Sequence, residues 1–207
     1  MHIATFKEVR NMEEHDFRIY RSKRDLRNAL LTLLKEEPFE KISVKDICDS
    51  AHINKMTFYR HYDDKYDLLN DVVNSIADEI YKKCASSLAR NQATSLCETC
   101  ALISGEVIEE CFNRKEEILS IIDSNNSLGS EVLNGTIENI VNRLIDELSN
   151  VYHIKYRKDY VSAFIVGGYS ALIAKLLRGK RLTKEQIEKG FIGIYNDAVA
   201  SNLIINR

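Results

Sequence analysis

The sequence is poor in residues that interrupt helices. Its 207 residues include 1 proline and 8 glycines, whereas 44% of them are hydrophobic and 29% are charged. Such a composition is typical of globular proteins, and the shortage of proline favours long helices over turns. We therefore expect an all-α protein.

Long apolar runs and a signal peptide are also absent. No stretch approaches the ~20 uninterrupted apolar residues that a membrane span requires. Near the N-terminus, Glu8, Glu13, Glu14 and Asp16 stand where a signal peptide has its apolar core. The 5 cysteines are an odd number, which argues against a secreted disulfide framework and for reduced thiols. The sequence therefore predicts a cytoplasmic protein that has no membrane partner.

Catalytic motifs are missing as well. The chain has no glycine-rich phosphate loop, no GxSxG or HExxH motif and no spaced carboxylates on a recognisable scaffold, so we expect no enzyme and no cofactor. One CxxC, formed by Cys97 and Cys100 with Cys111 further along the same predicted helix, could act as a redox or zinc switch. No second CxxC and no nearby histidine completes a four-ligand site. Plain packing is therefore favoured, and no metal site is predicted.

The charges are nearly balanced but unevenly distributed. The formal net charge is −2. Residues 18–65 carry 11 Lys and Arg against 8 Asp and Glu, whereas residues 66–207 carry 16 against 19. An excess of this size also occurs on ordinary solvated surfaces. Charge alone therefore does not identify a nucleic-acid partner.

The first periodic apolar segment predicts a helix that ends before Pro38, because proline cannot continue it. Phe39 and Ile42 follow in a short connection and are expected to close the side of a small core. One face of the helix carries Leu26, Ala29, Leu30, Leu33 and Leu34.

Capping residues then mark three further helix starts. Ser43 can cap a second helix, with Asp46 three residues later as in a capping box. Asn54 can cap a third, and the Asp63–Asp64 pair interrupts the chain before a fourth. Together these signals predict helices over residues 44–51, 55–62 and 65–82.

The helix over residues 55–62 presents an unusual set of side chains. Phe58 and Tyr62 share one side and are expected to face the core. The other sides carry a hydroxyl, a phenol, a guanidinium and an imidazole. A helix in the major groove of DNA uses such groups, because Arg contacts guanine edges, Thr contacts phosphates or thymine methyls, and Tyr reaches phosphate oxygens.

These residues resemble the N-terminal domain of TetR-family transcriptional regulators. The similarity covers about residues 20–75 and rests on ISVKDI at 42–47, on AHINKMTFYRHY at 51–62, and on Lys65 with Leu68–Leu69. His52 departs from the family, which usually has glycine in this turn, since positive φ is less favourable for histidine. The segments PFEKI and DKYDLL look most like the subgroup that includes dihydroxyacetone-kinase regulators.

The resemblance implies a helix-turn-helix that binds a double-stranded DNA operator. The alternatives are a core helix pair without DNA contacts and an interaction protein that has lost DNA binding. The joint match of the quoted residues argues against the first alternative, and the basic, hydroxyl-bearing surface of residues 55–65 argues against the second. The positions that the resemblance implies at the DNA are Ser43, Lys45, Lys55, Met56, Thr57, Tyr59, Arg60, His61 and Lys65.

Beyond the fourth predicted helix, few capping or helix-breaking residues mark the helix boundaries. Residues 86–95 are expected to form a linker or a frayed helix end. Gly167–Gly168 lie inside an apolar helical segment at a cost of ~1 kcal/mol per glycine relative to alanine, which suggests close backbone approach, as at a dimer interface. The last helix carries a second apolar stripe, although packing within one chain would also explain it. The predicted helices cover residues 96–113, 115–123, 128–149, 155–178 and 184–204.

The resemblance also implies the role of these C-terminal helices. A small-molecule inducer would bind among them, and the last two would pair with a second copy as a homodimer that binds a pseudo-palindromic operator. An inducer would release the repressor by changing the separation of the recognition helices. An activator with the same module, or a thiol- or metal-responsive regulator, stays open. Aromatic character on inner helices suggests Phe112, Phe164 and Tyr169 as ligand-binding residues.

The predicted organisation has two domains. Residues 17–65 form a three-helix DNA-binding domain of the helix-turn-helix type. Residues 66–207 form a helical ligand-binding and dimerisation domain, and the helix over residues 65–82 connects the two.

Overall fold

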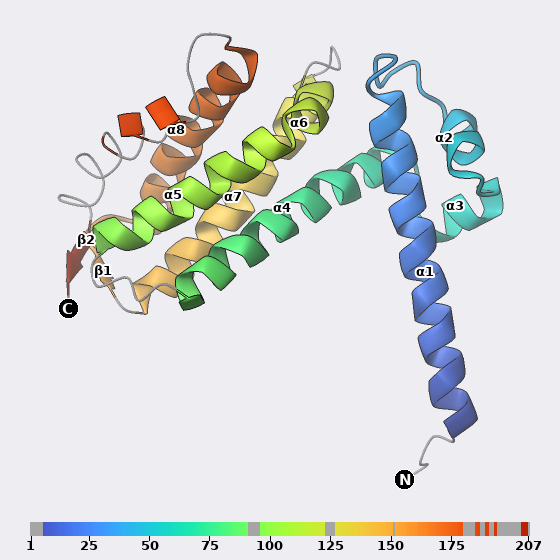
Figure 1. Cartoon of the computed structure of the whole chain (residues 1–207), viewed down its shortest axis with the longest axis horizontal. Coiled ribbons are helices and arrows are strands. Elements are labelled where there is room, and N and C mark those ends of the chain that lie inside the picture. Colours follow the sequence, from blue (N-terminus) through green and yellow to red (C-terminus); the bar gives the residue numbers. More distant parts are fainter. Residues whose placement is uncertain are drawn as a thin grey trace. The chain divides into compact units, whose positions relative to one another are not determined.

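Helices make up nearly all of the computed structural model, which confirms the all-α expectation (Figure 1). The structure describes residues 6–90, 96–122, 127–150, 152–179, 185–186, 189–190, 193 and 204–206. The chain separates into two units, residues 1–72 and 73–207, and the boundary falls within one helix.

The first unit contains three helices and the start of a fourth. The first helix packs against the second and third, which also contact each other. Its core is made by large side chains that are fully buried, including the predicted plug residues Phe39 and Ile42. The helices are α1 (Phe6–Leu33), α2 (Val44–Ala51), α3 (Lys55–His61) and α4 (Lys65–Arg90), which continues into the second unit.

Both predicted N-caps of this unit are confirmed. The backbone N–H of Asp46 donates to Ser43 Oγ at 3.2 Å, and the N–H of Ser43 donates to Asp46 Oδ2 at 2.9 Å, which completes a capping box. The Ser43 hydroxyl also donates to the Asp46 carboxylate, and this hydrogen bond, followed by the one from the Ser43 N–H, lowers the pKa of Asp46 below its ordinary value. At α3, Asn54 Oδ1 accepts a hydrogen bond from the N–H of Thr57 at 2.8 Å. Local sequence therefore fixes where the two short helices begin.

The turn between α2 and α3 contains a strained backbone position. His52 has φ of 54° and lies in the left-handed region, where glycine is favoured. Its N–H donates to the carbonyl of Asp49 at 3.3 Å, and that of Ile53 donates to Cys48 at 2.9 Å, so α2 stops abruptly. The turn geometry that the sequence predicts is thus formed with histidine in place of glycine.

The second unit is a bundle of long helices. The seventh helix packs against the eighth, which also contacts the fifth and sixth. These helices are α5 (Leu96–Asn113), α6 (Lys115–Ile122), α7 (Ser127–Ser149) and α8 (Lys158–Arg178). None of the helices in the described ranges is long and apolar enough to cross a membrane.

Helix α4 is longer than the sequence predicts. It continues to Arg90, so residues 86–90 are helical and not a linker, and residues 91–95 lie outside the described ranges. Cys84 and Ser87 are buried in this extension. Of the two alternatives for residues 86–95, the helix end therefore agrees with the structure at residues 86–90 and the linker does not.

Two short strands are a second departure from the prediction. Strand β1 (Tyr152–Ile154) pairs antiparallel with β2 (Ile204–Asn206), so the expected break near Tyr152 is extended and the expected final helix does not reach residue 204. Helix α8 accordingly begins at Lys158 and not at residue 155. Most of the predicted helix over residues 184–204 lies outside the described residues.

Candidate nucleic-acid interface

Helix α3 holds its predicted contact residues toward solvent. Met56 is 76% exposed and Tyr59 is 57% exposed, which is unusual for side chains of this size. Arg60 and Lys55 are also exposed. Thr57 and His61 are half-buried at the edges of this surface. We call these six residues the α3 surface.

Two aromatic rings anchor α3 from behind. Phe58 is 0% exposed and Tyr62 is 3% exposed, as the sequence predicts, and their ring centroids lie 5.6 Å apart. The Tyr62 hydroxyl donates to Asp71 Oδ2 of α4 at 2.6 Å, and Arg27 Nη1 of α1 lies 3.4 Å from the same oxygen. Burial, and then the hydrogen bond to Asp71, raise the pKa of Tyr62, which keeps it a neutral donor. Helix α3 is thereby tied to both long helices of its unit.

His61 is held neutral at the edge of the α3 surface. Burial lowers the pKa of its imidazole below the ordinary value of 6.5, and the positive charges of Lys23 and Arg60 lower it further. A neutral imidazole can both donate and accept a hydrogen bond.

The start of α2 also offers polar groups to solvent. Ser43 and Lys45 are exposed there, at the end of the helix where its free N–H groups point outward. The Ser43 hydroxyl takes part in the capping box and lies 2.5 Å from Asp46 Oδ2. Ser43 thus combines a capping role with an exposed position.

Lys65 makes several hydrogen bonds within its own unit. Its Nζ donates to the carbonyl oxygens of Phe39, Glu40 and Ile42 at 2.8, 3.0 and 2.8 Å. The ammonium also lies 4.7 Å from the centre of the Phe39 ring. Because an ammonium has three hydrogens, all of its donors are used within the protein. Lys65 therefore fastens the connection before α2 to the start of α4.

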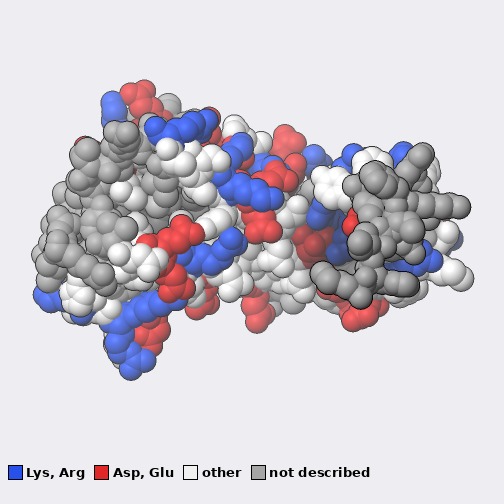
Figure 2. Space-filling view, turned by 90° about the horizontal axis from the view of Figure 1, so that it is seen from below, with Lys and Arg blue, Asp and Glu red and all other residues white. Residues whose placement is uncertain are grey.

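On the face shown in Figure 2, Lys and Arg side chains lie among Asp and Glu side chains over the described residues. The described charges of this face therefore do not by themselves indicate a nucleic-acid partner.

The second unit encloses a cavity of about 130 Å³. Its described wall comes from α4, α5, α6, α7 and α8, all from residue 73 onward. Of the three predicted ligand residues, Tyr169 lines the cavity. Phe112 does not, because it packs against Ile108 and Leu172, and Phe164 is 61% exposed. Aromatic character was thus a poor guide, and the branched aliphatic residues that make most of the wall gave no sequence signal beyond ordinary helix amphipathicity.

The described cysteines show no sign of reactivity. Cys111 is buried, and burial raises the pKa of its thiol to about 12, while burial raises that of Cys84 to about 11. A protonated, buried thiol is a poor nucleophile and a poor metal ligand. The side chains of Cys97 and Cys100 lie outside the described residues. The structure therefore argues against Cys111 as part of a thiol switch.

Sequence comparison identifies the first unit. Residues 26–72 match the family described as bacterial regulatory proteins of the tetR family. The chain is 30% identical over 57 residues to YxbF, an HTH-type transcriptional regulator of Bacillus subtilis, in a match that spans 28% of this chain and 15% of YxbF.

Structural comparison extends over both units. A TetR transcriptional regulator of Streptococcus agalactiae is 19% identical, with 88% of this chain and 98% of that one covered at a TM-score of 0.62. A protein of Syntrophomonas wolfei assigned to the TetR family is 15% identical, with 89% and 98% covered at a TM-score of 0.72. At these identities the likeness shows the fold. Residues 26–72 are therefore similar in sequence to the DNA-binding domain of the tetR family, and the chain shares its fold with solved TetR-family regulators.

Proposed function

We propose that the protein regulates transcription by inserting α3 into the major groove of an operator. The observation that carries this proposal is the α3 surface, which exposes Tyr59 and Arg60 while Phe58 and Tyr62 fix the helix from behind. Arg60 suits a guanine edge, and Thr57 suits a phosphate or a thymine methyl. An enzyme has no need to expose such side chains together on a two-turn helix.

The backbone of the operator would be held from the flanks. Ser43 and Lys45 lie at the exposed start of α2, where helix N–H groups and a lysine charge suit phosphate oxygens. Lys55 and His61 extend the same contacts on α3. We leave Lys65 out of the proposed contacts, because its three donors are used by backbone carbonyls.

A homodimer would supply the second recognition helix. On α8, Tyr160 and Phe164 are 65% and 61% exposed, and they fall at helical spacing with the exposed Gly167 and Gly168. Among the described residues, nothing lies within 4 Å of where a Cβ would stand at either glycine. A second copy could therefore approach this apolar face closely, and the two α3 helices would then contact a pseudo-palindromic site.

Ligand binding in the second unit would release the operator, which makes the protein a repressor in our proposal. Helix α4 supports this coupling, because it lines the cavity at Ile76 and Ile80 and is fastened by Lys65 to the connection before α2. A shift of α4 would thus change the position of α3. Activation by the same module is the alternative, and the dihydroxyacetone-kinase subgroup stays a prediction. A DNA partner implies a cytoplasmic location.

Selection of bound sequences from random double-stranded DNA tests the proposal. We expect recovery of a pseudo-palindrome whose affinity falls steeply with salt, because bound phosphates release counterions. The variant Phe164→Glu should weaken both dimerisation in sedimentation and operator binding, whereas Lys158→Glu, on the same helix, should leave both intact. Recovery of no preferred sequence would contradict operator recognition.

A further inference from the structure

We propose that the cavity of the second unit selects an uncharged, hydrocarbon-like ligand and rejects ionic ones. The inference deepens the proposed function, since it names the chemical class to which the regulator responds. It rests on the chemistry of the described cavity wall, on the hydrogen bonds that the two hydroxyl groups of that wall already make, and on the absence of the nearby charged residues from it.

The wall is almost purely aliphatic. Among the described residues that line the cavity are nine isoleucines, three valines and two leucines, and none carries a charge. Branched side chains of this kind have few rotamers, so the wall is stiff. An ion that entered would lose its hydration without gaining a partner, which is strongly unfavourable.

The two hydroxyl groups of the wall are engaged elsewhere. Thr136 Oγ1 lies 3.3 Å from Asn74 Oδ1, to which it donates, and the Tyr169 hydroxyl lies 2.5 Å from Ser104 Oγ. Both bonds are made inside the unit and leave the aliphatic groups as the main contact surface. A ligand therefore gains its affinity from apolar burial.

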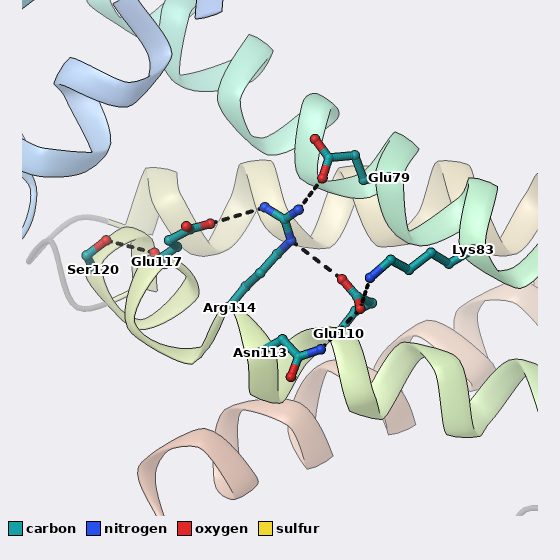
Figure 3. Close-up of polar contacts among 7 residues, drawn as sticks. All are labelled: Glu79, Lys83, Glu110, Asn113, Arg114, Glu117 and Ser120. Carbon is teal, nitrogen blue, oxygen red and sulfur yellow. Dashed lines mark hydrogen bonds and ion pairs between the residues drawn. The ribbon is translucent and has the colours of Figure 1, made fainter. Parts of the chain in front are cut away.

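A charged cluster at the α5–α6 corner contributes nothing to the described cavity wall. Figure 3 shows Arg114 between Glu79 of α4 and Glu117 of α6, with Glu110 held by Lys83 and Asn113. None of the seven residues drawn there lines the cavity. Cys111 and Ile118 of the same corner do line the cavity. The α5–α6 corner therefore contributes apolar side chains to the described wall, whereas its charged side chains lie outside that wall.

The volume sets the size of the ligand. The cavity measures about 130 Å³. A protein cavity of ~150 Å³ lined by aliphatic and aromatic side chains stays dry and binds benzene. One aromatic ring, or an aliphatic group of similar volume, therefore fits without rearrangement.

Three ring compounds of nearly equal size test the proposal: toluene, benzoate and benzylammonium. Their binding to the full chain is measured without DNA, by calorimetry and by the shift of thermal unfolding. We expect toluene to bind and to raise the unfolding temperature, and both ions to bind at least ~100-fold more weakly, because an unpaired charge resists burial. Equal or tighter binding of either ion, or no binding of toluene, would overturn the proposal.

Filling the cavity locates the binding. Ala77→Leu should abolish toluene binding, whereas Ala85→Leu, on the same helix but outside the wall, should leave it unchanged. Ile137→Phe, at a wall residue of α7, also fills the cavity and replaces Ala77→Leu if that variant fails to fold. Toluene binding that survives both filling variants would place it elsewhere and overturn the inference. These binding assays contain no DNA, so they test the ligand class separately from operator binding. If the protein binds toluene but binds no operator, the proposed function is contradicted and the inference about the cavity is not.

Discussion

The two units of the chain are specified in different ways. In the first, residues within a few positions of each other set the helix boundaries, as when Ser43 and Asp46 cap α2 or Asn54 caps α3. In the second, the determining contacts join residues far apart in sequence, such as Glu79 with Arg114. A short, locally defined helix presents the proposed DNA-contact groups, whereas the cavity exists only once several helices have packed.

This difference indicates which positions tolerate substitution. A rigid α3 requires its caps and its aromatic anchors, so its outer side chains can vary without loss of the fold. In the second unit, ion pairs of Lys83 with Glu110 and of Arg114 with Glu79 join α4 to the α5–α6 corner (Figure 3).

The largest effect is expected from Arg114→Met in the second unit. Arg114 pairs with Glu79, Glu110 and Glu117, so its loss leaves three carboxylates without their shared partner. Because Glu110 is only 3% exposed, we expect a loss of about 2–4 kcal/mol in the free energy of unfolding. Chemical denaturation measures it.

The matched control is Lys158→Met, which removes an exposed ion pair with Asp146. It should cost less than about 0.5 kcal/mol. Equal destabilisation by the two variants would mean that the Arg114 cluster does not stabilise the bundle.

Lys65→Met should have the next largest effect, and in the first unit. The change preserves the length of the side chain but leaves three carbonyl groups without a donor. We expect a loss of about 2 kcal/mol, which denaturation monitored by tyrosine fluorescence can follow.

Lys65→Arg should not rescue the stability, because a planar guanidinium cannot point three hydrogens at three converging oxygens. The exposed Lys45→Met is the control and should be nearly neutral for stability. If Lys65→Met is as stable as the wild type but binds operator weakly, the side chain contacts DNA and its structural role is secondary.

Asn54→Ala should produce a smaller loss. It removes the acceptor for the Thr57 N–H at the start of α3, and loss of such a cap costs about 1 kcal/mol. Asn54→Asp retains the acceptor and should restore the thermal unfolding temperature. If Asn54→Asp lowers the unfolding temperature as much as Asn54→Ala does, packing and not the cap defines the start of α3.

The smallest expected effect is the pH dependence from His61. Its pKa is lowered in the free protein, so charging it costs folding stability as pH falls below 6.5, whereas a DNA phosphate favours the charged form. Operator affinity should thus rise modestly from pH 8 to pH 5. His61→Gln should reduce this dependence of operator affinity on pH. If the variant and the wild type show the same dependence, His61 does not contact the DNA.

The contrast between local and long-range contacts also explains which features can be predicted from the sequence. The caps, the burial of Phe58 and Tyr62 and the turn at His52 follow from adjacent residues and are predicted correctly. The hydrogen bonds of Lys65 are not predictable from adjacent residues, because its carbonyl partners lie more than twenty residues away in the chain. Residues 86–90 and the cavity wall depend likewise on which helices meet, which periodicity does not encode.

The most direct test of the account is operator affinity after Arg60→Ala. Arg60 is exposed, so the variant should unfold at the same temperature as the wild type. Its affinity for the selected operator, measured by fluorescence anisotropy at fixed salt, should fall by about 10- to 100-fold, with weaker discrimination at one base position. Unchanged affinity in a folded Arg60→Ala protein would contradict the claim that α3 contacts the DNA bases.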